Sequence, residues 1–413
     1  MKILHTSDWH LGKCLENRER LAEQREVLNE VCQLVESRAV DLVLIAGDIF
    51  DNFLPTAAAE ELFFDTIERL ADEGRRGVVI IAGNHDSPER LCAAKQLAKR
   101  YGIVLLGLPK SAAVVCQPPL GGVQVVQSGA GWLELVLPKV AEHAVIIALP
   151  YPSEARLEEV LTQELDEQRL QEAYAEKVGW LFHELAIHFR PETVNLAMSH
   201  LFVLGGETTE SERPIQLGGA PTVPATKLPA AAQYIALGHL HKPQKASGAK
   251  MPAYYSGSLL QYSFAEAGTE KAVMLVEAVP GQPAQIKKLP LKSGRPLVHW
   301  VARNGFEEAV TWCREGRDPE AWIDLQIYTP TPLNTEQNRT LRGLRPEIVN
   351  LWPVLTATET GEVLALNRRA LPLPELFDGF YKSKTGGVPD PELVKLFVEL
   401  ALRAQTLEAE VEA

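Results

Sequence analysis

Apolar runs and amphipathic segments alternate along the first hundred residues of the chain. Three short apolar runs have the pattern of strands that are covered on both faces: residues 2–8, 41–48 and 77–83. Each is followed by a segment in which apolar residues recur at the spacing of a helix: residues 17–39, 56–74 and 87–102. This alternation predicts an α/β fold with a parallel sheet.

The remainder of the chain is richer in strands. We predict a helix at 153–189, a hairpin at 271–291 that turns at Pro280–Gly281, and strands at 113–117, 123–129, 144–150, 193–200, 233–241 and 253–264. A sandwich of two sheets over residues 1–291 accommodates this set. From residue 292 the strand and helix patterns restart, which predicts a small α/β domain at 292–365 and a C-terminal helical segment at 366–413.

The composition is that of a soluble globular protein. Of the 413 residues 46% are hydrophobic and 23% charged, no apolar run is long enough to span a bilayer, and no secretory leader is evident. We therefore expect a cytoplasmic protein that does not contact a membrane. The five scattered cysteines argue against a disulfide framework or a zinc ribbon. Taken alone, the net charge of −13 argues against nucleic-acid binding, but bound cations can reverse the field locally.

Polar residues follow five of the predicted strands. At these ends stand Asp8 and His10, Asp48 and Asp51, Asn84 and His85, His200, and finally His239 and His241. Ligands of parallel sheets bind beyond the carboxyl ends of the strands. Each motif alone is more often structural than functional. Five strands ending in oxygen and nitrogen donors exceed what core packing requires, because unpaired buried polar groups are costly.

The types of donor at these strand ends indicate a pair of divalent metals. A carboxylate can bridge two cations about 3.5–4 Å apart, and such a pair activates water against a phosphate ester near neutral pH. The donors are carboxylate, amide and imidazole without thiolate, which suits Mn²⁺, Mg²⁺ or Fe and argues against a structural zinc.

The same motifs resemble those of a known family. "SDWH", "AGDIFD", "AGNHD", "MSH" and "LGHLH" match, in this order, the signature of the calcineurin-like metallophosphoesterases, whose fold is a two-sheet α/β/β/α sandwich. The flanking "SDWHLGK", "GNHDSPERL" and "YSGSLLQYSF" narrow the resemblance to the SbcD family of bacterial nuclease subunits. It covers about residues 1–290 by motif and rests on domain order beyond them.

The resemblance implies a role for each residue at the strand ends. The ligands implied for one metal are Asp8, His10, Asp48 and His241, and those for the other are Asp48, Asn84, His200 and His239, with Asp48 as the bridge. His85 is implied to stabilise developing charge and to protonate the leaving oxygen, with Asp51 as the carboxylate that orients it. Other histidines, such as His5 and His143, are interpreted as structural or exposed.

The function that the resemblance implies is that of a metal-dependent DNA nuclease. It implies exonuclease action on double-stranded ends, endonuclease action on single-stranded or hairpin DNA, and a place in DNA repair, recombination and replication. Two divalent ions, with Mn²⁺ favoured, and a homodimer are implied as well. An SbcC-type coiled-coil ATPase is the implied partner, and this sequence contains no P-loop motif of its own.

Several alternatives stay open on the sequence alone. A phosphatase or small-substrate phosphodiesterase would use the same chemistry, and a non-catalytic scaffold, disfavoured by the complete ligand set, would keep the fold. Lys13 and Arg90 follow site motifs and are either phosphate contacts or solvated surface cations. The C-terminal apolar faces around Leu376 and Leu396 either dock the partner or cover the chain's own small domain.

Overall fold

A six-stranded sheet is built mainly from the N-terminal alternation of strands and helices. Its order is β15-β14-β1-β2-β3-β4, with bounds β1 Lys2–Thr6, β2 Leu42–Ala46, β3 Gly77–Ile81, β4 Ile103–Leu106, β14 Ala272–Glu277 and β15 Gln285–Pro290. Strands β1 to β3 are parallel, as predicted, β4 continues the parallel sheet, and β14 joins β1 in antiparallel fashion. The β14–β15 hairpin lies within the predicted range.

A seven-stranded sheet holds the central part of the chain. Its order is β12-β13-β11-β8-β7-β6-β5, with bounds β5 Gln124–Gly129, β6 Trp132–Val136, β7 Ala144–Leu149, β8 Val194–His200, β11 Tyr234–Gly238, β12 Gln244–Lys245 and β13 Ala253–Tyr255. Its central strands β7, β8, β11 and β13 are parallel to one another. A separate short pair joins β9 Phe202–Val203 to β10 Thr222–Val223.

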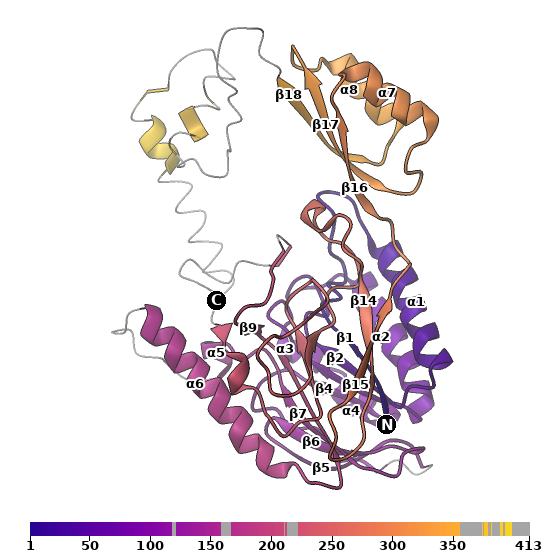
Figure 1. The fold of residues 1–413 in the computed structure, drawn as a ribbon, viewed down its shortest axis with the longest axis vertical. Helices are drawn as coiled ribbons and strands as arrows, with labels where there is room; N and C mark the ends of the chain where they lie inside the picture. The colour runs from indigo at the N-terminus through magenta and orange to yellow at the C-terminus, as the bar shows by residue number, and fades with distance from the viewer. Residues whose placement is uncertain are drawn as a thin grey trace. The chain divides into compact units, whose positions relative to one another are not determined.

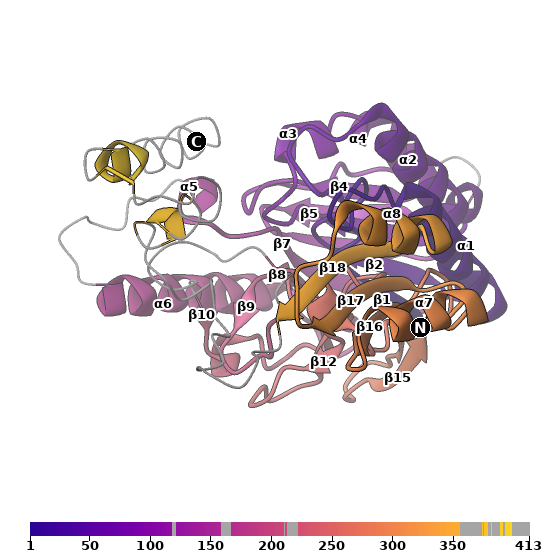
Figure 2. The ribbon, with the colours of Figure 1, turned by 90° about the horizontal axis from the view of Figure 1, so that it is seen from above.

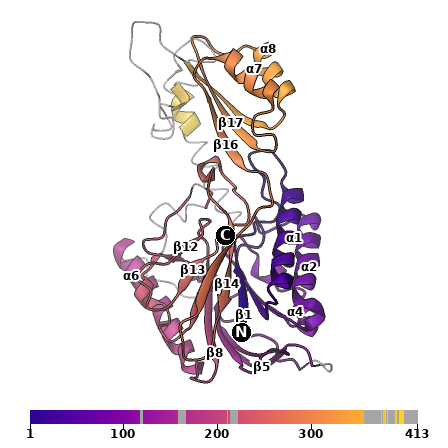
Figure 3. The same ribbon diagram turned by 45° about the vertical axis from the view of Figure 1, so that its right-hand side comes forward.

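Helices cover the outer faces of both sheets (Figures 1 to 3). Helices α1 Leu21–Ser37 and α2 Ala57–Ala71 lie on the outer side of the six-stranded sheet, and α6 Glu167–Leu185 lies on the outer side of the other. The shorter helices are α3 Pro88–Leu91, α4 Lys95–Ala98, α5 Glu154–Leu157, η1 Asp72–Gly74, η2 Lys99–Tyr101, η3 Ala186–His188, η4 Ala225–Lys227 and η5 Phe264–Glu266.

The apolar pattern explains this layering. Strand β2 is buried at every position because one of its faces packs on the helices and the other on the second sheet. Val43 and Ile45 belong to the core beneath α1 and α2, whereas Leu42 and Leu44 belong to the core between the sheets. Alternate residues of one strand therefore serve two cores. The predicted α/β/β/α sandwich is confirmed.

A third sheet, with two helices, lies within residues 292–365, the range predicted as a small α/β domain. Its order is β16-β17-β18, with bounds β16 Leu297–Ala302, α7 Phe306–Glu315, β17 Trp322–Thr329, α8 Thr335–Leu344 and β18 Ile348–Leu355. Val310, Leu325 and Leu341 lie in its core, between the helices and the sheet. Asn334 and Gln337 form a capping box that starts α8.

Some predicted elements differ from those observed. The helix predicted at 87–102 is broken into α3, α4 and η2, because the segment buries too few apolar residues to hold one continuous face. The strand predicted at 113–117 is wrong: only an isolated bridge between Cys116 and Val125 occurs there. The strand predicted at 253–264 ends at Tyr255. Strands β4 and β6 were not predicted.

The structure, a computed structural model, describes residues 1–117, 121–157, 167–209, 211–212, 222–355, 374, 376–378, 381, 389–390 and 393–398. Most of the segment predicted as helical at 366–413 lies outside the described residues. The chain divides into two units, residues 1–328 with 333–353 and residues 329–332 with 354–413. Within the second unit Phe377 stacks on Phe397 with 4.2 Å between ring centroids. In the described part of the chain, no helix has both the length and the apolar character needed to cross a bilayer.

Candidate metal centre

The carboxyl ends of five strands, three from one sheet and two from the other, meet at one edge of the sandwich. Strands β1, β2, β3, β8 and β11 lead into the residues predicted as metal ligands. Six of these residues are buried: Asp8, His10, Asp48, His200, His239 and His241. Asn84 is partly exposed. The structure thus brings every predicted ligand to the same place.

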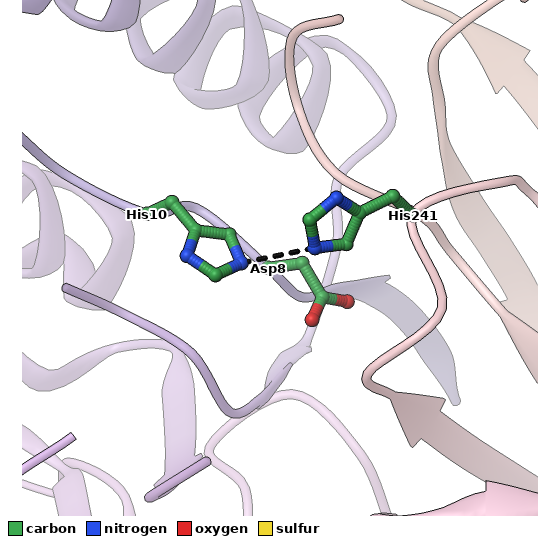
Figure 4. Close-up of side chains that lie close together, drawn as sticks. All are labelled: Asp8, His10 and His241. Carbon is green, nitrogen blue, oxygen red and sulfur yellow. Dashed lines mark hydrogen bonds between the residues drawn. The ribbon is translucent and has the colours of Figure 1, made fainter. Parts of the chain in front are cut away.

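The first group of donors comes from β1 and β11. One donor atom each of Asp8, His10 and His241 lies within 4.8 Å of the others (Figure 4). His10 Nε2 faces His241 Nε2 at 3.0 Å, and it lies 3.5 Å from Asp48 Oδ2. Two imidazole nitrogens and two carboxylates therefore converge, as in a metal site.

The second group of donors surrounds Asn84. Its Oδ1 lies 2.9 Å from His200 Nε2 and 3.2 Å from His239 Nδ1. Asp48 Oδ2 lies 3.4 Å from the same His200 nitrogen. The Asp48 carboxylate thus lies next to histidines of both groups, which is the position of a bridging ligand.

Hydrogen bonds behind the histidines decide which ring nitrogen faces the centre. His200 Nδ1 donates to the Ala46 carbonyl at 2.9 Å, and His241 Nδ1 lies 2.5 Å from Ser211 Oγ. The Nε2 lone pairs are then free to point inward, the arrangement that metal-ligating histidines use. Oxygen and nitrogen donors without thiolate, held in this way, fit two divalent cations such as Mn²⁺.

The backbone at the centre is strained. Asp8, His10 and Asp48 have φ values of 53°, 45° and 50°, and His239 has a φ of 107°. Non-glycine residues in these regions cost about 1–3 kcal/mol each and persist where the surrounding structure enforces them. The strain turns the side chains of the strand ends toward one another.

The turn after β3 admits the bridging carboxylate. A Cβ on Gly83 would lie 2.1 Å from Asp48 Oδ1, so only glycine leaves room for it. The same oxygen accepts a hydrogen bond of 2.9 Å from the His85 amide. Asp86, the last residue of the "AGNHD" motif, to which the sequence assigned no role, is fully buried and accepts from the amides of Ile49, Phe50 and Gly83. It ties the turns after β2 and β3 together.

His85 lies in the centre, but its partner differs from the predicted one. His85 Nδ1 contacts the main-chain carbonyl of Asp51 at 2.6 Å. The Asp51 carboxylate instead lies 3.1 Å from Lys13 Nζ and 3.5 Å from His10 Nδ1. A carbonyl partner holds the proton on Nδ1 and leaves Nε2, at 4.0 Å from Asp48 Oδ2, facing the centre.

Comparison with known proteins places this geometry in a family. The calcineurin-like phosphoesterase family matches residues 1–243. The SbcD subunit of the nuclease SbcCD from Bacillus subtilis is 44% identical over 402 residues, which is 97% of this chain and 98% of the relative. The chain belongs to the SbcD family of calcineurin-like phosphoesterases. Proteins of the same name from Staphylococcus epidermidis and Rhodobacter capsulatus are 31% and 30% identical, over 86% and 73% of this chain and 86% and 75% of theirs.

Electrostatics in the centre of this SbcD-family chain reflect ionisable groups that are buried close to one another. Burial raises the pKa of Asp8 to about 7, against the opposing effect of His200. Burial alone would lower the pKa of His200, but Asp48 and Asp8 raise it to about 9. Burial lowers the pKa of His239 to about 3. Asp48 and Asp8 thus favour a positive charge on His200, which indicates that this buried site is suited to cations.

The two candidate DNA contacts are engaged within the SbcD-family chain itself. Lys13 pairs with Asp51, as described above. Arg90 forms a two-pronged contact with Glu60, at 2.7 Å through Nε and 3.2 Å through Nη2. The Arg90 side chain is 43% exposed, whereas that of Lys13 is 18% exposed. Their role toward DNA stays a prediction.

Supporting residues were missed in the sequence of this SbcD-family chain because their partners are distant. Gln24 donates to the His10 carbonyl at 2.7 Å and accepts from the Gly12 amide. Glu212 accepts from the His241 amide at 2.8 Å. Lys271, buried beside Glu266, donates to the His241 carbonyl at 2.9 Å. Gln24, Glu212 and Lys271 hold the main chain of two candidate ligands.

Proposed function

We propose that this chain is the metal-dependent nuclease component of an SbcCD-type complex. Two facts support the proposal: curated relatives with this role are 30–44% identical to the chain, and seven candidate ligands converge at one sheet edge. The convergence carries the proposal, because a scaffold that had lost catalysis would not need two buried groups of donor atoms.

Two divalent cations, Mn²⁺ foremost, complete the proposed site. Asp8, His10, Asp48 and His241 would hold one of them, and Asp48, Asn84, His200 and His239 the other. When bound, the cations neutralise the phosphate and activate water for attack on phosphorus. The chain's own contribution is to keep these donors fixed, through strained turns and through hydrogen bonds from the ring nitrogens that do not face the metal.

His85 is the residue to which we assign proton transfer. Its Nδ1–H is held by the Asp51 carbonyl, so the doubly protonated imidazolium form of His85 can give its Nε2 proton to the oxygen that leaves phosphorus and remain as the neutral Nδ1–H imidazole. The position of Nε2, 4.0 Å from an oxygen of the bridging Asp48, keeps that proton beside the reacting phosphate. Asp51 acts through its main chain on His85, while its carboxylate neutralises Lys13 and faces His10.

The proposed substrate and partners rest on the family resemblance of the sequence motifs. We propose double-stranded DNA ends for exonuclease action and single-stranded or hairpin DNA for endonuclease action, in repair, recombination and replication. An SbcC-type ATPase would supply ATP dependence, with the C-terminal helical segment as its docking element. Leu393 and Leu396 of this segment are exposed, which suits such a contact. A homodimer and a cytoplasmic location complete the proposal.

The test is a substrate panel. Purified protein is mixed with Mn²⁺ and offered linear duplex DNA, circular single-stranded DNA and p-nitrophenyl phosphate, with and without the ATPase. Cleavage of DNA is the expected result. Turnover of p-nitrophenyl phosphate alone would favour a phosphatase, and no turnover together with no bound metal would favour a scaffold.

A further inference from the structure

The turn Gly83–Asp86 carries a candidate ligand and the candidate acid on four residues. On its inner side, the Asp86 carboxylate accepts three main-chain amides, as described above. Two carbonyl groups of the turn, those of Gly83 and Asp86, accept no main-chain hydrogen bond from the described residues, so the sheet alone does not fix this part of the turn.

Arg156 binds both of these carbonyls. Its Nη1 donates to Gly83 O and its Nη2 to Asp86 O, each at 2.7 Å. These distances are those of short, charge-assisted hydrogen bonds. The two contacts flank Asn84 and His85 on either side. The guanidinium group therefore links the first and last residues of the turn, without contacting the metal ligands themselves through these bonds.

Arg156 is itself held in place by the segment that follows β7. The Tyr151 amide donates to the Ala82 carbonyl at 3.0 Å, just before the turn. The Tyr151 ring lies 5.5 Å from the Arg156 guanidinium and meets the His200 ring edge-on at 6.1 Å. Leu157, the next residue of α5, is buried. The arginine thus belongs to a packed wall beside the centre.

We propose that Arg156 is a positioning residue for the reaction, through its two-pronged contact with the turn that carries Asn84 and His85. The inference rests on the proposed function. A planar guanidinium can bridge two carbonyls with parallel N–H donors, whereas a lysine ammonium is a single point of charge. Loosening the turn would shift His85 Nε2 relative to Asp48. Misplacement by about 1 Å can cost roughly a hundredfold in rate.

The experiment compares Arg156→Ala and Arg156→Lys with the wild type. The matched control is Arg190→Ala, because Arg190 also makes a two-pronged contact, with Glu134, outside the centre. Initial rates are measured with Mn²⁺ on bis-p-nitrophenyl phosphate and on DNA. Both Arg156 variants should lose about 10- to 100-fold in kcat with KM changed less than about threefold, while the control keeps its rate.

Two further readouts separate positioning from folding. Millimolar guanidinium should restore part of the kcat of Arg156→Ala but none of that of Arg156→Lys, at matched ionic strength. In metal-free protein, hydrogen exchange of a peptide spanning the turn should be at least about tenfold faster in Arg156→Ala, with β14 unchanged. Wild-type kcat in Arg156→Ala, full activity in Arg156→Lys, or exchange that rises equally in β14 overturns the proposal.

The same data keep this inference apart from the proposed function. If the wild type hydrolyses the small diester but not DNA, the nuclease proposal fails and the diester rates still judge Arg156. If it hydrolyses neither substrate, hydrogen exchange at the turn decides, since that measurement needs no activity. Unchanged exchange there overturns the positioning role.

Discussion

Two clusters of ionisable side chains, one around Glu134 and one at the sheet edge, differ in how their charges are paired. Around Glu134, every charge has an opposite partner: Arg190 lies at 2.6 Å and His143 at 2.6 Å. At the sheet edge, potential metal-ligand atoms lie beside one another: His10 Nε2 lies 3.0 Å from His241 Nε2, and Asn84 Oδ1 lies beside ring nitrogens of His200 and His239. The first cluster is complete as a structural network. The arrangement of the second cluster is explained by cations that its atoms would bind.

The backbone makes the same distinction. Four residues of the sheet-edge cluster have positive φ values, whereas Glu134, His143 and Arg190 do not. Strain is retained where function requires a fixed geometry. Converging lone pairs and strained strand ends therefore indicate a metal site. The number of histidines in a cluster does not by itself indicate one.

Removing the bridging carboxylate should have the largest effect on the sheet-edge cluster. Asp48→Ala deletes the oxygens next to histidines of both groups, so we expect loss of bound Mn²⁺ and at least roughly a thousandfold loss of activity. Elemental analysis of the purified variant measures the first effect and DNA cleavage the second. A variant that still binds two ions per chain would show that Asp48 is no bridge.

Removing His85 should separate catalysis from metal binding. His85→Ala should keep its metal content and lose about a hundred- to ten-thousandfold in kcat, because only proton transfer is removed. Metal analysis beside initial rates tests this. Loss of metal in this variant would contradict the role assigned to His85.

His5 extends the comparison to a buried histidine without a carboxylate. It contacts the Tyr234 hydroxyl at 2.8 Å, and burial lowers its pKa to about 3. Between the ordinary pKa of 6.5 and 3, the unfolded chain binds a proton that the folded protein does not. Stability should therefore fall as pH drops below 6.5, by about 2 kcal/mol at pH 5 from this residue.

Urea unfolding of metal-free protein at pH 8 and pH 5 measures this dependence. His5→Gln cannot take up a proton and should show a shallower loss between the two pH values. An equal pH dependence in the variant would assign the loss to other groups.

Glu134→Gln tests whether the cluster around Glu134 contributes to stability alone. It weakens the pairing with Arg190 and His143 and should cost about 1–2 kcal/mol, less than a fully buried pair because both partners are partly exposed. Denaturant unfolding gives the cost, and metal content and kcat should not change. A fall in bound Mn²⁺ would mean that the two clusters are coupled.

Much of the centre was predictable because its residues follow directly after strands in the sequence. Asp8, Asp48 and His200 follow apolar runs, and parallel strands bring such ends to one edge. The partner of His85 was not predictable: whether the Asp51 carboxylate or its carbonyl faces the imidazole depends on the path of one turn. The local pattern leaves that path open.

Long-range contacts account for most of what was missed. Arg156 binds carbonyls about seventy positions earlier, and carbonyls carry no signature in a sequence. Strand β4 was missed because it has only four residues and directly follows a segment that was predicted as one helix. Elements with strong periodicity, such as α1 and the β14–β15 hairpin, were found close to their predicted positions.

Anomalous diffraction from crystals grown with Mn²⁺ tests the central claim most directly. We predict two peaks about 3.5–4 Å apart, one beside Asp8, His10 and His241 and the other beside Asn84, His200 and His239, with Asp48 contacting both. A single peak, or peaks away from these side chains, would contradict the two-metal account.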